Sequence, residues 1–429
     1  MFGGAFLMRP IGGILMGYLG DLYGRKKALE ISIFLMAFPT FCMGCLPTYA
    51  QVGPISYILL IIIRLLQGLS VGGQLMSSLV FTLEGRPKSK WGLLGSYVMA
   101  TANFGTLMGG VVGYAIRQKL TAEQVMTYGW RIPFLSGILV SLCGFYLKYC
   151  CSDDDADSFH HGGGGRERSS NVTKTKTQRK QRNNPIFLAF SKDNRRQLLA
   201  ACFPSMLWSG GFYLTFVWMA IYMLDLIPNS MGEDAMAINS IALFLSVCLL
   251  FPIAGGLSDT YGRKRVMTIG AVLFGLLSPI LVVLIGLGKP YVAFLCQVIM
   301  GICLSFWGAP MTAYMIESFP PEARLTSAAV GYNIGQACVG GLTPGLATYM
   351  VDQYGYRTPG LLLTGLAIVA LFGLWVVGPQ QFPVGYSEDK SVECKPLITI
   401  KRGEDHEDYE TETHAATNVT GEYYRSSSV

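Results

Sequence analysis

The sequence predicts an all-α, polytopic membrane protein made of two parallel-related helical bundles. Its composition, a series of long apolar segments and a motif that occurs twice predict this fold. Hydrophobic residues make up 51% of the 429 residues and charged residues 14%, and the mean hydropathy is +0.40. A water-soluble chain needs about 25% charged residues to cover its surface. A soluble enzyme, a secreted disulfide scaffold and a nucleic-acid-binding protein therefore fit poorly.

Eleven segments are long and apolar enough to be membrane-spanning helices. Crossing roughly 30 Å of hydrocarbon takes about 20 helical residues. The predicted spans are residues 2–19, 28–46, 55–83, 92–116, 131–150, 198–224, 236–257, 266–287, 290–315, 325–350 and 358–378.

Basic residues are unevenly distributed between the two sets of connections. One alternating set holds five Lys and Arg residues, whereas the other set, with Lys148 beside it, holds 21. Basic connections remain in the cytosol, so this asymmetry places the second set and the C-terminal tail there. The plasma membrane is the expected location, because no transit-like or cleavable leader is visible.

The apolar segments divide the chain into four parts. Residues 1–150 are predicted to form an N-terminal helical bundle and residues 198–378 a C-terminal six-helix bundle. The linker 151–197 and the tail 379–429 are polar, and their composition cannot build a core, so both are predicted to be disordered in the cytosol.

A loop motif, G-x-x-x-D-x-x-G-R-[KR]-[KR], occurs at residues 17–27 and again at 255–265, with seven of eleven positions identical. Glycine permits a tight turn between two helices. The aspartate can cap the next helix, and the arginine can pair with an acid on a neighbouring helix, so that the loop acts as a latch between conformers. The alternative is that the basic cluster only fixes the topology. The predicted gating-loop residues are Gly17, Asp21, Gly24, Arg25, Glu84, Asp259, Gly262, Arg263 and Glu317.

The repeat also predicts a difference between the halves. Two predicted spans precede Asp259 in the second half, whereas one precedes Asp21 in the first. Two equal halves would contain twelve spans, so we expect that the first half lacks its opening helix. Two explanations remain open: the gene model begins late, or the protein truly has eleven spans.

With this motif the chain resembles the major facilitator superfamily, and in particular its metabolite:proton symporter branch around the proline/betaine transporters. Further matches extend the resemblance from about residue 2 to 378, apart from the central loop. They are Phe6-Leu-Met-Arg9-Pro10-Ile-Gly12-Gly13, Arg64-Leu-Leu-Gln67-Gly68-Leu-Ser70-Val-Gly72-Gly73, Gly129-Trp130-Arg131-Ile-Pro133-Phe134, and Asn333 followed by Gly340-Gly341-Leu-Thr343-Pro344.

The resemblance implies the major facilitator fold, with a cavity between two bundles that opens to alternate sides of the membrane. It also implies a role for Arg64 in proton coupling. Two departures count against that role: Gln74 stands where relatives usually carry an acid, and the acid of the relatives' first helix is absent.

Arg9 and Arg64 are the only charged residues deep within predicted spans. An arginine at mid-membrane costs roughly 2.5–3.5 kcal/mol on insertion scales, so it should face a cavity or a partner. A guanidinium can hold a carboxylate through two hydrogen bonds, which favours an anionic or zwitterionic solute. The alternative is a structural pair with an acid of the absent helix. The predicted substrate-binding residues are Arg64, Arg9, Gln67, Gln74, Asn333 and Gln336, of which the amides can instead bond across helices.

Four aromatic residues follow the central loop along one span: Trp208, Tyr213, Trp218 and Tyr222. Such rings can enclose a quaternary ammonium group, although an aromatic stripe more often packs between helices.

The sequence thus predicts a carrier that moves a small organic solute by alternating access, with proton coupling as a further hypothesis. A solute sensor without transport, or a fragment of a carrier, is the alternative. The expected partners of the protein are the solute and the lipid bilayer, not nucleic acid. No enzymatic activity, cofactor or metal is expected, since the four histidines form no cluster and no nucleophile or phosphate-binding motif occurs.

Overall fold

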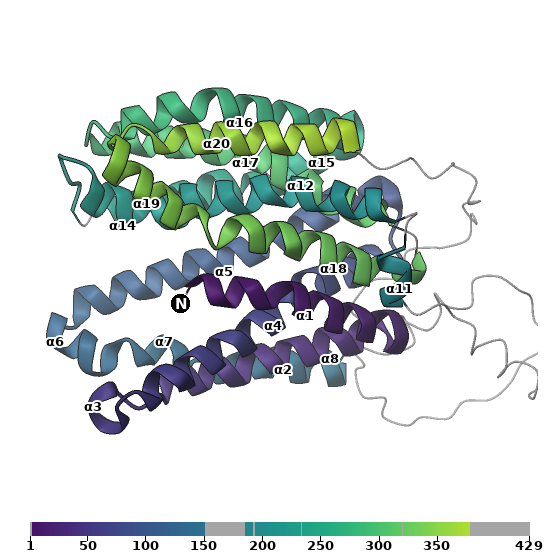
Figure 1. Cartoon of the computed structure of the whole chain (residues 1–429), viewed down its shortest axis with the longest axis horizontal. Helices are drawn as coiled ribbons and strands as arrows, with labels where there is room; N and C mark the ends of the chain where they lie inside the picture. The colour runs from purple at the N-terminus through teal and green to yellow at the C-terminus, as the bar shows by residue number, and fades with distance from the viewer. Residues whose placement is uncertain (1, 151–184, 192–193, 233, 320, 378–429) are drawn as a thin grey trace, which may run out of the picture. The chain divides into compact units, whose positions relative to one another are not determined.

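The computed structural model describes residues 2–150, 185–191, 194–232, 234–319 and 321–377. Within these residues every regular element is a helix, as the fold class predicts (Figure 1). Short 3-10 or π-helical segments, labelled η, interrupt or extend several of the α-helices.

The first half contains four long helices and several short ones. Its elements are α1 Phe2–Tyr23, α2 Arg25–Gly44, α3 Tyr49–Val52, α4 Ile55–Leu83, η1 Lys88–Lys90, α5 Trp91–Lys119, α6 Ala122–Gln124, η2 Val125–Gly129, α7 Arg131–Leu135 and α8 Gly137–Cys150.

The second half begins with a short helix and continues through six helical passes. Its elements are α11 Pro185–Ala189, α12 Arg195–Phe212, η4 Tyr213–Trp218, α13 Met219–Ile221, η5 Tyr222–Leu226, α14 Asp234–Leu243, η6 Phe244–Cys248, α15 Leu250–Tyr261, α16 Arg263–Ile285, α17 Pro290–Glu317, η7 Pro321–Ala323, α18 Arg324–Gly335, η8 Gln336–Gly340, α19 Thr343–Tyr354, α20 Pro359–Phe372 and η9 Gly373–Val377.

The count of eleven spans is approximate. Eight helical stretches in the described part of the chain are long and apolar enough to cross a membrane. The other three predicted spans, 2–19, 92–116 and 325–350, are also helical. The first two are rich in glycine, which lowers their hydropathy, and the third is interrupted between η8 and α19.

The prediction of a disordered linker over residues 151–197 extends too far toward the C-terminus. Residues 151–184, like the predicted tail 379–429, lie outside the described residues. Residues Pro185–Ala189 instead form α11, and α12 already begins at Arg195. Ala189 is fully buried where α11 lies against α1 and α18, and this packing anchors the segment.

Two helix pairs join the halves in a reciprocal way. The first helix of the first half, α1, packs against α18 and η8, while α5 packs against α14, η6 and α15 (Figure 1). By the repeat, α1 corresponds to α14–α15 and α5 to α18–η8, so the two contacts are equivalent. The largest hydrophobic core lies mainly in the second half, whereas the first half has a small separate cluster of Met43, Leu46 and Ile63.

Candidate functional site

The first copy of the loop motif reaches from its own half into the other. Asp21 lies in the last turn of α1, and its side chain is buried. One carboxylate oxygen accepts hydrogen bonds from the backbone N–H and the hydroxyl of Thr326, over 2.9 and 2.5 Å. Thr326 is in the first turn of α18, where backbone N–H groups have no partner within the helix. Asp21 therefore caps a helix of the second half.

The second copy makes the equivalent contact in the opposite direction. The carboxylate of Asp259, in the last turn of α15, accepts from the backbone N–H groups of Gly92 and Leu93 over 2.9 and 2.8 Å. Both groups lie in the first turn of α5. A carboxylate at a helix N-terminus gains from the unpaired N–H groups and from the helix dipole, typically 0.3–1 kcal/mol. Each half thus caps one helix of the other.

Arginines of the motif support both caps. Arg25 pairs with Asp21 and lies 3.0 Å from Glu84, and it also donates to the backbone oxygen of Pro321 in the second half over 3.1 Å. Arg263 pairs with Asp259 and lies 3.1 Å from Glu317. Arg263 donates in turn to the backbone oxygen of Lys88 in the first half, over 3.3 Å. We call these two networks the first and the second latch, and the end of the helices that carries them the basic end.

Glycines are required where the helices of the latches approach each other. A Cβ on Gly17 would lie 2.6 Å from the Cα of Thr326, and a Cβ on Gly255 would collide with the backbone oxygen of Gly92. Gly24 and Gly262 form the turns between helices with φ of 103° and 92°, which favour glycine. The motif therefore combines turns, caps and close helix contacts in one structure.

Arg9 extends from α1 toward the second half. Its guanidinium donates to Oε1 of Gln336 over 3.3 Å and to the hydroxyl of Tyr213 over 3.4 Å. Ser209 donates to the same Gln336 oxygen over 2.8 Å, and the guanidinium carbon lies 4.0 Å from the centroid of the Phe6 ring. Within the described part of the chain, no carboxylate forms an ion pair with Arg9. We call these five residues the Arg9 cluster.

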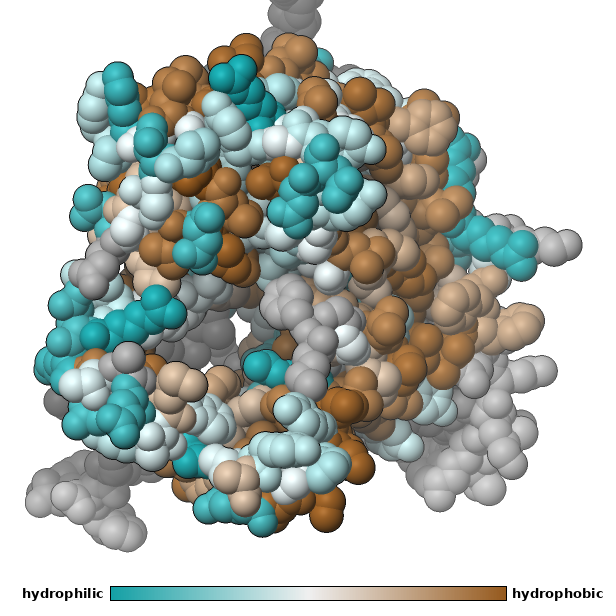
Figure 2. All heavy atoms as spheres, turned by 60° about the vertical axis from the view of Figure 1, so that its left-hand side comes forward, coloured by the Kyte–Doolittle hydropathy of each residue, from teal (hydrophilic) through white to brown (hydrophobic). Residues whose placement is uncertain are grey.

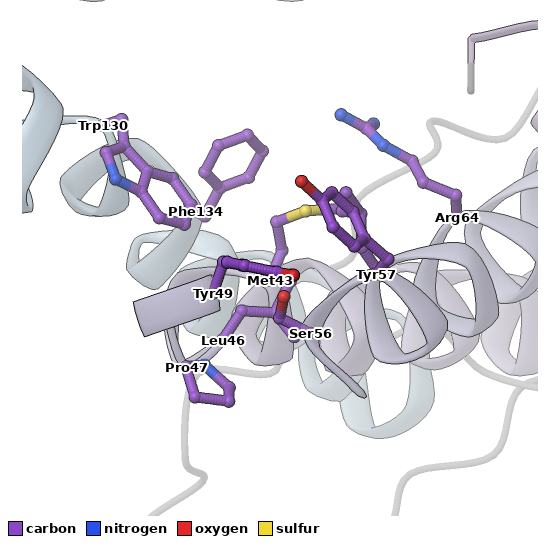
Figure 3. Close-up of a pocket in the computed structure, with 10 residues that line it drawn as sticks. Met43, Leu46, Pro47, Tyr49, Ser56, Tyr57, Arg64, Trp130 and Phe134 are labelled. Atoms are coloured by element: carbon purple, nitrogen blue, oxygen red, sulfur yellow. The ribbon is translucent and has the colours of Figure 1, made fainter. Parts of the chain in front are cut away.

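Arg64 lies in a different place, within the first half. Its guanidinium donates to Oε1 of Gln67 over 3.3 Å, and Gln67 donates to Thr40 over 3.1 Å. Arg64 also lines a pocket of about 340 Å³ that is otherwise mainly apolar (Figure 3). Its lining residues are Met43, Leu46, Pro47, Tyr49, Ser56, Tyr57, Leu60, Arg64, Trp130 and Phe134. The two predicted arginines therefore belong to separate groups.

The other predicted binding residues differ in their roles. Asn333 is buried and donates to the backbone oxygen of Gly72 over 2.6 Å, which links α18 to α4 across the halves. Gln336 belongs to the Arg9 cluster, whereas Gln74 is half-buried on α4. The amide of Asn333 therefore forms a bond between helices, which was the alternative to substrate binding for this residue.

Of the four aromatic residues after the linker, three pack within the second half. Trp208 contacts Phe251, Trp218 donates to Thr348, and Tyr222 donates to the backbone oxygen of Tyr356. Only Tyr213 reaches Arg9.

Sequence reasoning missed several members of these networks. Ser209 joins the Arg9 cluster, Thr326 donates the capping hydrogen bonds to Asp21, and Arg324 lies 3.0 Å from Glu84. Arg324 is the only one of the three with a signal in the sequence, since it is a basic residue at the start of α18, seven residues after the predicted latch acid Glu317.

The halves meet at the basic end, and Figure 2 shows a hollow between them on the opposite side, where α3 and α6 lie. A duplicated helical bundle with such a closed end and a hollow is typical of secondary transporters.

The comparisons with known proteins agree with this class. Residues 1–377 match the family described as "Sugar (and other) transporter", and the chain belongs to this family. A putative proline/betaine transporter of Staphylococcus aureus (strain COL) is 29% identical over 367 residues, which is 85% of this chain and 75% of the relative. The proline/betaine transporter of Escherichia coli K12 is 29% identical over 375 residues, or 85% and 71%.

Solved structures show the same fold. The major facilitator superfamily proton:xylose symporter XylE matches with a TM-score of 0.66 and 18% identity, over 87% of this chain and 84% of that one. The fucose:proton symporter FucP of E. coli matches with a TM-score of 0.58 and 15% identity, over 88% and 89%. The predicted major facilitator fold is confirmed. The chain is a multi-pass membrane protein and a secondary transporter of small solutes.

Proposed function

We propose that this transporter carries a small zwitterionic or carboxylate solute through the plasma membrane, and that Arg9 binds its carboxylate. The observation that carries the proposal is the Arg9 cluster, in which a guanidinium from one half meets neutral groups of the other. A charged side chain at this depth is costly, so an arginine that has no acidic partner among the described residues indicates a function.

The neighbours of Arg9 suit such a solute. Gln336 and Tyr213 hold the guanidinium through hydrogen bonds of 3.3 and 3.4 Å, which are long enough to be exchanged for shorter bonds to a carboxylate. The rings of Phe6 and Tyr213 lie 5.2 Å apart, edge to face. An ammonium group of a zwitterion can interact with such aromatic faces.

Alternating access follows from the position of the cluster between the halves. The latches close the basic end, which the charge distribution places in the cytosol, and the hollow lies at the opposite end (Figure 2). A solute that binds to groups of both halves can favour rearrangement of the interface, provided that it binds the two conformers differently. The latches then break as the cytosolic end opens.

Uptake into proteoliposomes tests this proposal. We expect accumulation of radiolabelled betaine, proline or a small monocarboxylate by the wild-type protein, and a loss of at least tenfold in Arg9→Gln. Arg117→Gln is the matched control, since Arg117 is exposed near the end of α5. An inward pH gradient that stimulates uptake would support proton coupling. Binding of solute without accumulation would instead favour the sensor alternative.

A further inference from the structure

The helices that follow the two copies of the loop motif differ in one ion pair. In the first half, Lys26 is buried in α2, and its ammonium nitrogen lies 3.9 Å from the carboxylate of Glu30, one turn further along the same helix. In the second half, the positions 238 residues later hold Lys264 and Thr268 in α16. The second copy therefore keeps the lysine, but a neutral hydroxyl replaces the acid.

A tryptophan of the last span lies beside both residues. The indole N–H of Trp375, in η9, donates to the hydroxyl of Thr268 over 3.0 Å. The ammonium nitrogen of Lys264 lies 6.0 Å from the centroid of the Trp375 ring, which is the outer limit of a cation–π contact. Among the described residues, no carboxylate forms an ion pair with Lys264. The positive charge of Lys264 is therefore available to an anion from outside these residues.

Further cations lie on the other side of η9. The guanidinium of Arg196, in the first turn of α12, donates to the backbone oxygens of Val377 and Val376 over 3.0 and 3.3 Å. This contact offsets the partial negative charge at the C-terminal end of the span. Arg195 and Arg265 are exposed in the first turns of α12 and α16. These two turns and η9 contain no acid, so this corner of the second half is positive.

An exposed apolar surface runs from this positive corner toward the middle of the membrane. The helices α16 and α20 lie side by side (Figure 1). On α16 the exposed residues Ile269, Leu273 and Leu276 recur every three or four positions, which places them on one face of the helix. On α20 the exposed residues include Ile368 and Phe372, four positions apart. The positive corner therefore continues into a surface that suits acyl chains.

We propose that this corner binds one anionic phospholipid of the cytosolic leaflet. We call the site, defined by Lys264, Trp375 and Arg196, the lipid site. The ammonium group of Lys264 pairs with the lipid phosphate, while the indole of Trp375 lies at the level of the headgroups, where tryptophan is enriched in membrane proteins. The acyl chains cover the apolar surface of α16 and α20. The charge distribution places this end of the helices in the cytosol, and anionic lipids of the cytosolic leaflet attract basic residues there.

Other occupants satisfy the lipid site less well. A zwitterionic lipid carries the same phosphate, but its ammonium group would bring another positive charge among the cations of α12 and α16. A soluble phosphate would pair with Lys264 but would leave the apolar surface below it uncovered. Only a headgroup with a net negative charge, joined to acyl chains, complements both parts of the surface. Its binding would link α16 to the last span, where Trp375 already contacts Thr268.

Native mass spectrometry of the full-length protein tests the lipid site. The detergent-purified protein is titrated with phosphatidylglycerol, or with phosphatidylcholine of the same acyl chains, and the lipids bound per molecule are counted. We expect the tightest-bound phosphatidylglycerol to bind about fivefold more weakly in Lys264→Gln, since one basic residue at an anionic lipid surface is lost. Binding of phosphatidylcholine should not change. Lys26→Gln is the matched control, because Lys26 has the same place in the motif but pairs with Glu30, and it should bind phosphatidylglycerol like the wild type.

A second variant leaves the lysine in place. Thr268→Glu gives Lys264 an acid four residues later, as Lys26 has in the first half, and it should weaken phosphatidylglycerol binding as much as Lys264→Gln. Both positions are half-buried, and monodisperse gel filtration checks that the variants fold. Equal phosphatidylglycerol binding by Lys264→Gln and the wild type, an equal loss in Lys26→Gln, or displacement of the lipid by inorganic phosphate would each overturn the proposal. Since the readout is lipid binding rather than uptake, a failure here leaves the proposed carboxylate transport unaffected.

Discussion

Glu84 and Arg324 form an ion pair across the two halves, with 3.0 Å between a carboxylate oxygen and a guanidinium nitrogen. The other carboxylate oxygen of Glu84 lies 3.0 Å from Arg25 in its own half, so one acid holds two arginines. In the first half, the corresponding helix α5 begins at Trp91, which cannot pair with an acid. Among the described residues, Glu317 therefore pairs with Arg263 alone, and the two latches are unequal.

Removing the charge of Glu84 should favour the conformer that is open at the basic end. The pair is partly exposed, with 22% exposure for Glu84 and 11% for Arg324, so its contribution is about 1 kcal/mol, or a roughly fivefold change in the conformational equilibrium. The labelling rate of a cysteine at Leu325, which is buried against Gly20, should rise accordingly in Glu84→Gln. Glu317→Gln breaks no pair between the halves and should raise the rate less. Equal rates in both variants would contradict the inequality of the latches.

Replacement of Asp21 by Asn should slow turnover more than it weakens solute binding. The amide keeps the shape of the side chain but loses the negative charge that caps α18 and pairs with Arg25. The Arg9 cluster, which we propose to bind the solute, does not include Asp21. Uptake kinetics and equilibrium binding in the same preparation separate the two effects, and a loss of affinity at unchanged turnover would argue against a latch.

The sequence predicted the parts of the latches that lie within one half. The pairing of Arg25 with an acid on a neighbouring helix follows from a short motif and from helix ends that must lie near each other, and Glu84 is indeed that partner. The cap from Asp21 to Thr326 joins residues 305 positions apart. Such a contact depends on how two bundles face each other, which no local pattern of hydropathy or charge specifies.

The positions of Arg9 and Arg64 relative to each other could not be predicted from local sequence patterns either. Hydropathy placed Arg9 and Arg64 at similar depths, and this alone made both candidates for one cavity. Their separation depends on the direction in which each side chain leaves its helix, toward the second half from α1 and into the first-half pocket from α4. The short helix α11 was missed because five residues are too few for a periodic signal, and its burial comes from tertiary packing.

Adding one methyl group at Gly17 should prevent full closure of the basic end. In Gly17→Ala the new Cβ would lie 2.6 Å from the backbone of Thr326, which cannot move without breaking the cap from Asp21. We expect uptake to fall several-fold, with faster labelling of the cysteine at position 325. Gly345→Ala is the control, because its Cβ meets no atom within 4 Å. Normal uptake by Gly17→Ala would show that close approach at this position is not needed.

Arg9 and Arg64, which are both half-buried, should give distinct defects. Arg9→Gln removes a charged donor from the proposed site, and hydrogen bonds to charged groups contribute about 1.5–3 kcal/mol, so the solute Kd should rise about 10- to 100-fold. Arg64→Ala should abolish accumulation, while membrane insertion stays intact and the solute Kd changes little, because Arg64 contacts Gln67 rather than the Arg9 cluster. Binding by calorimetry and uptake into proteoliposomes, on protein that elutes as a single gel-filtration peak, distinguish the two. Unchanged uptake by Arg64→Ala would remove this residue from the transport mechanism, and an unchanged Kd in Arg9→Gln would remove Arg9 from the binding site.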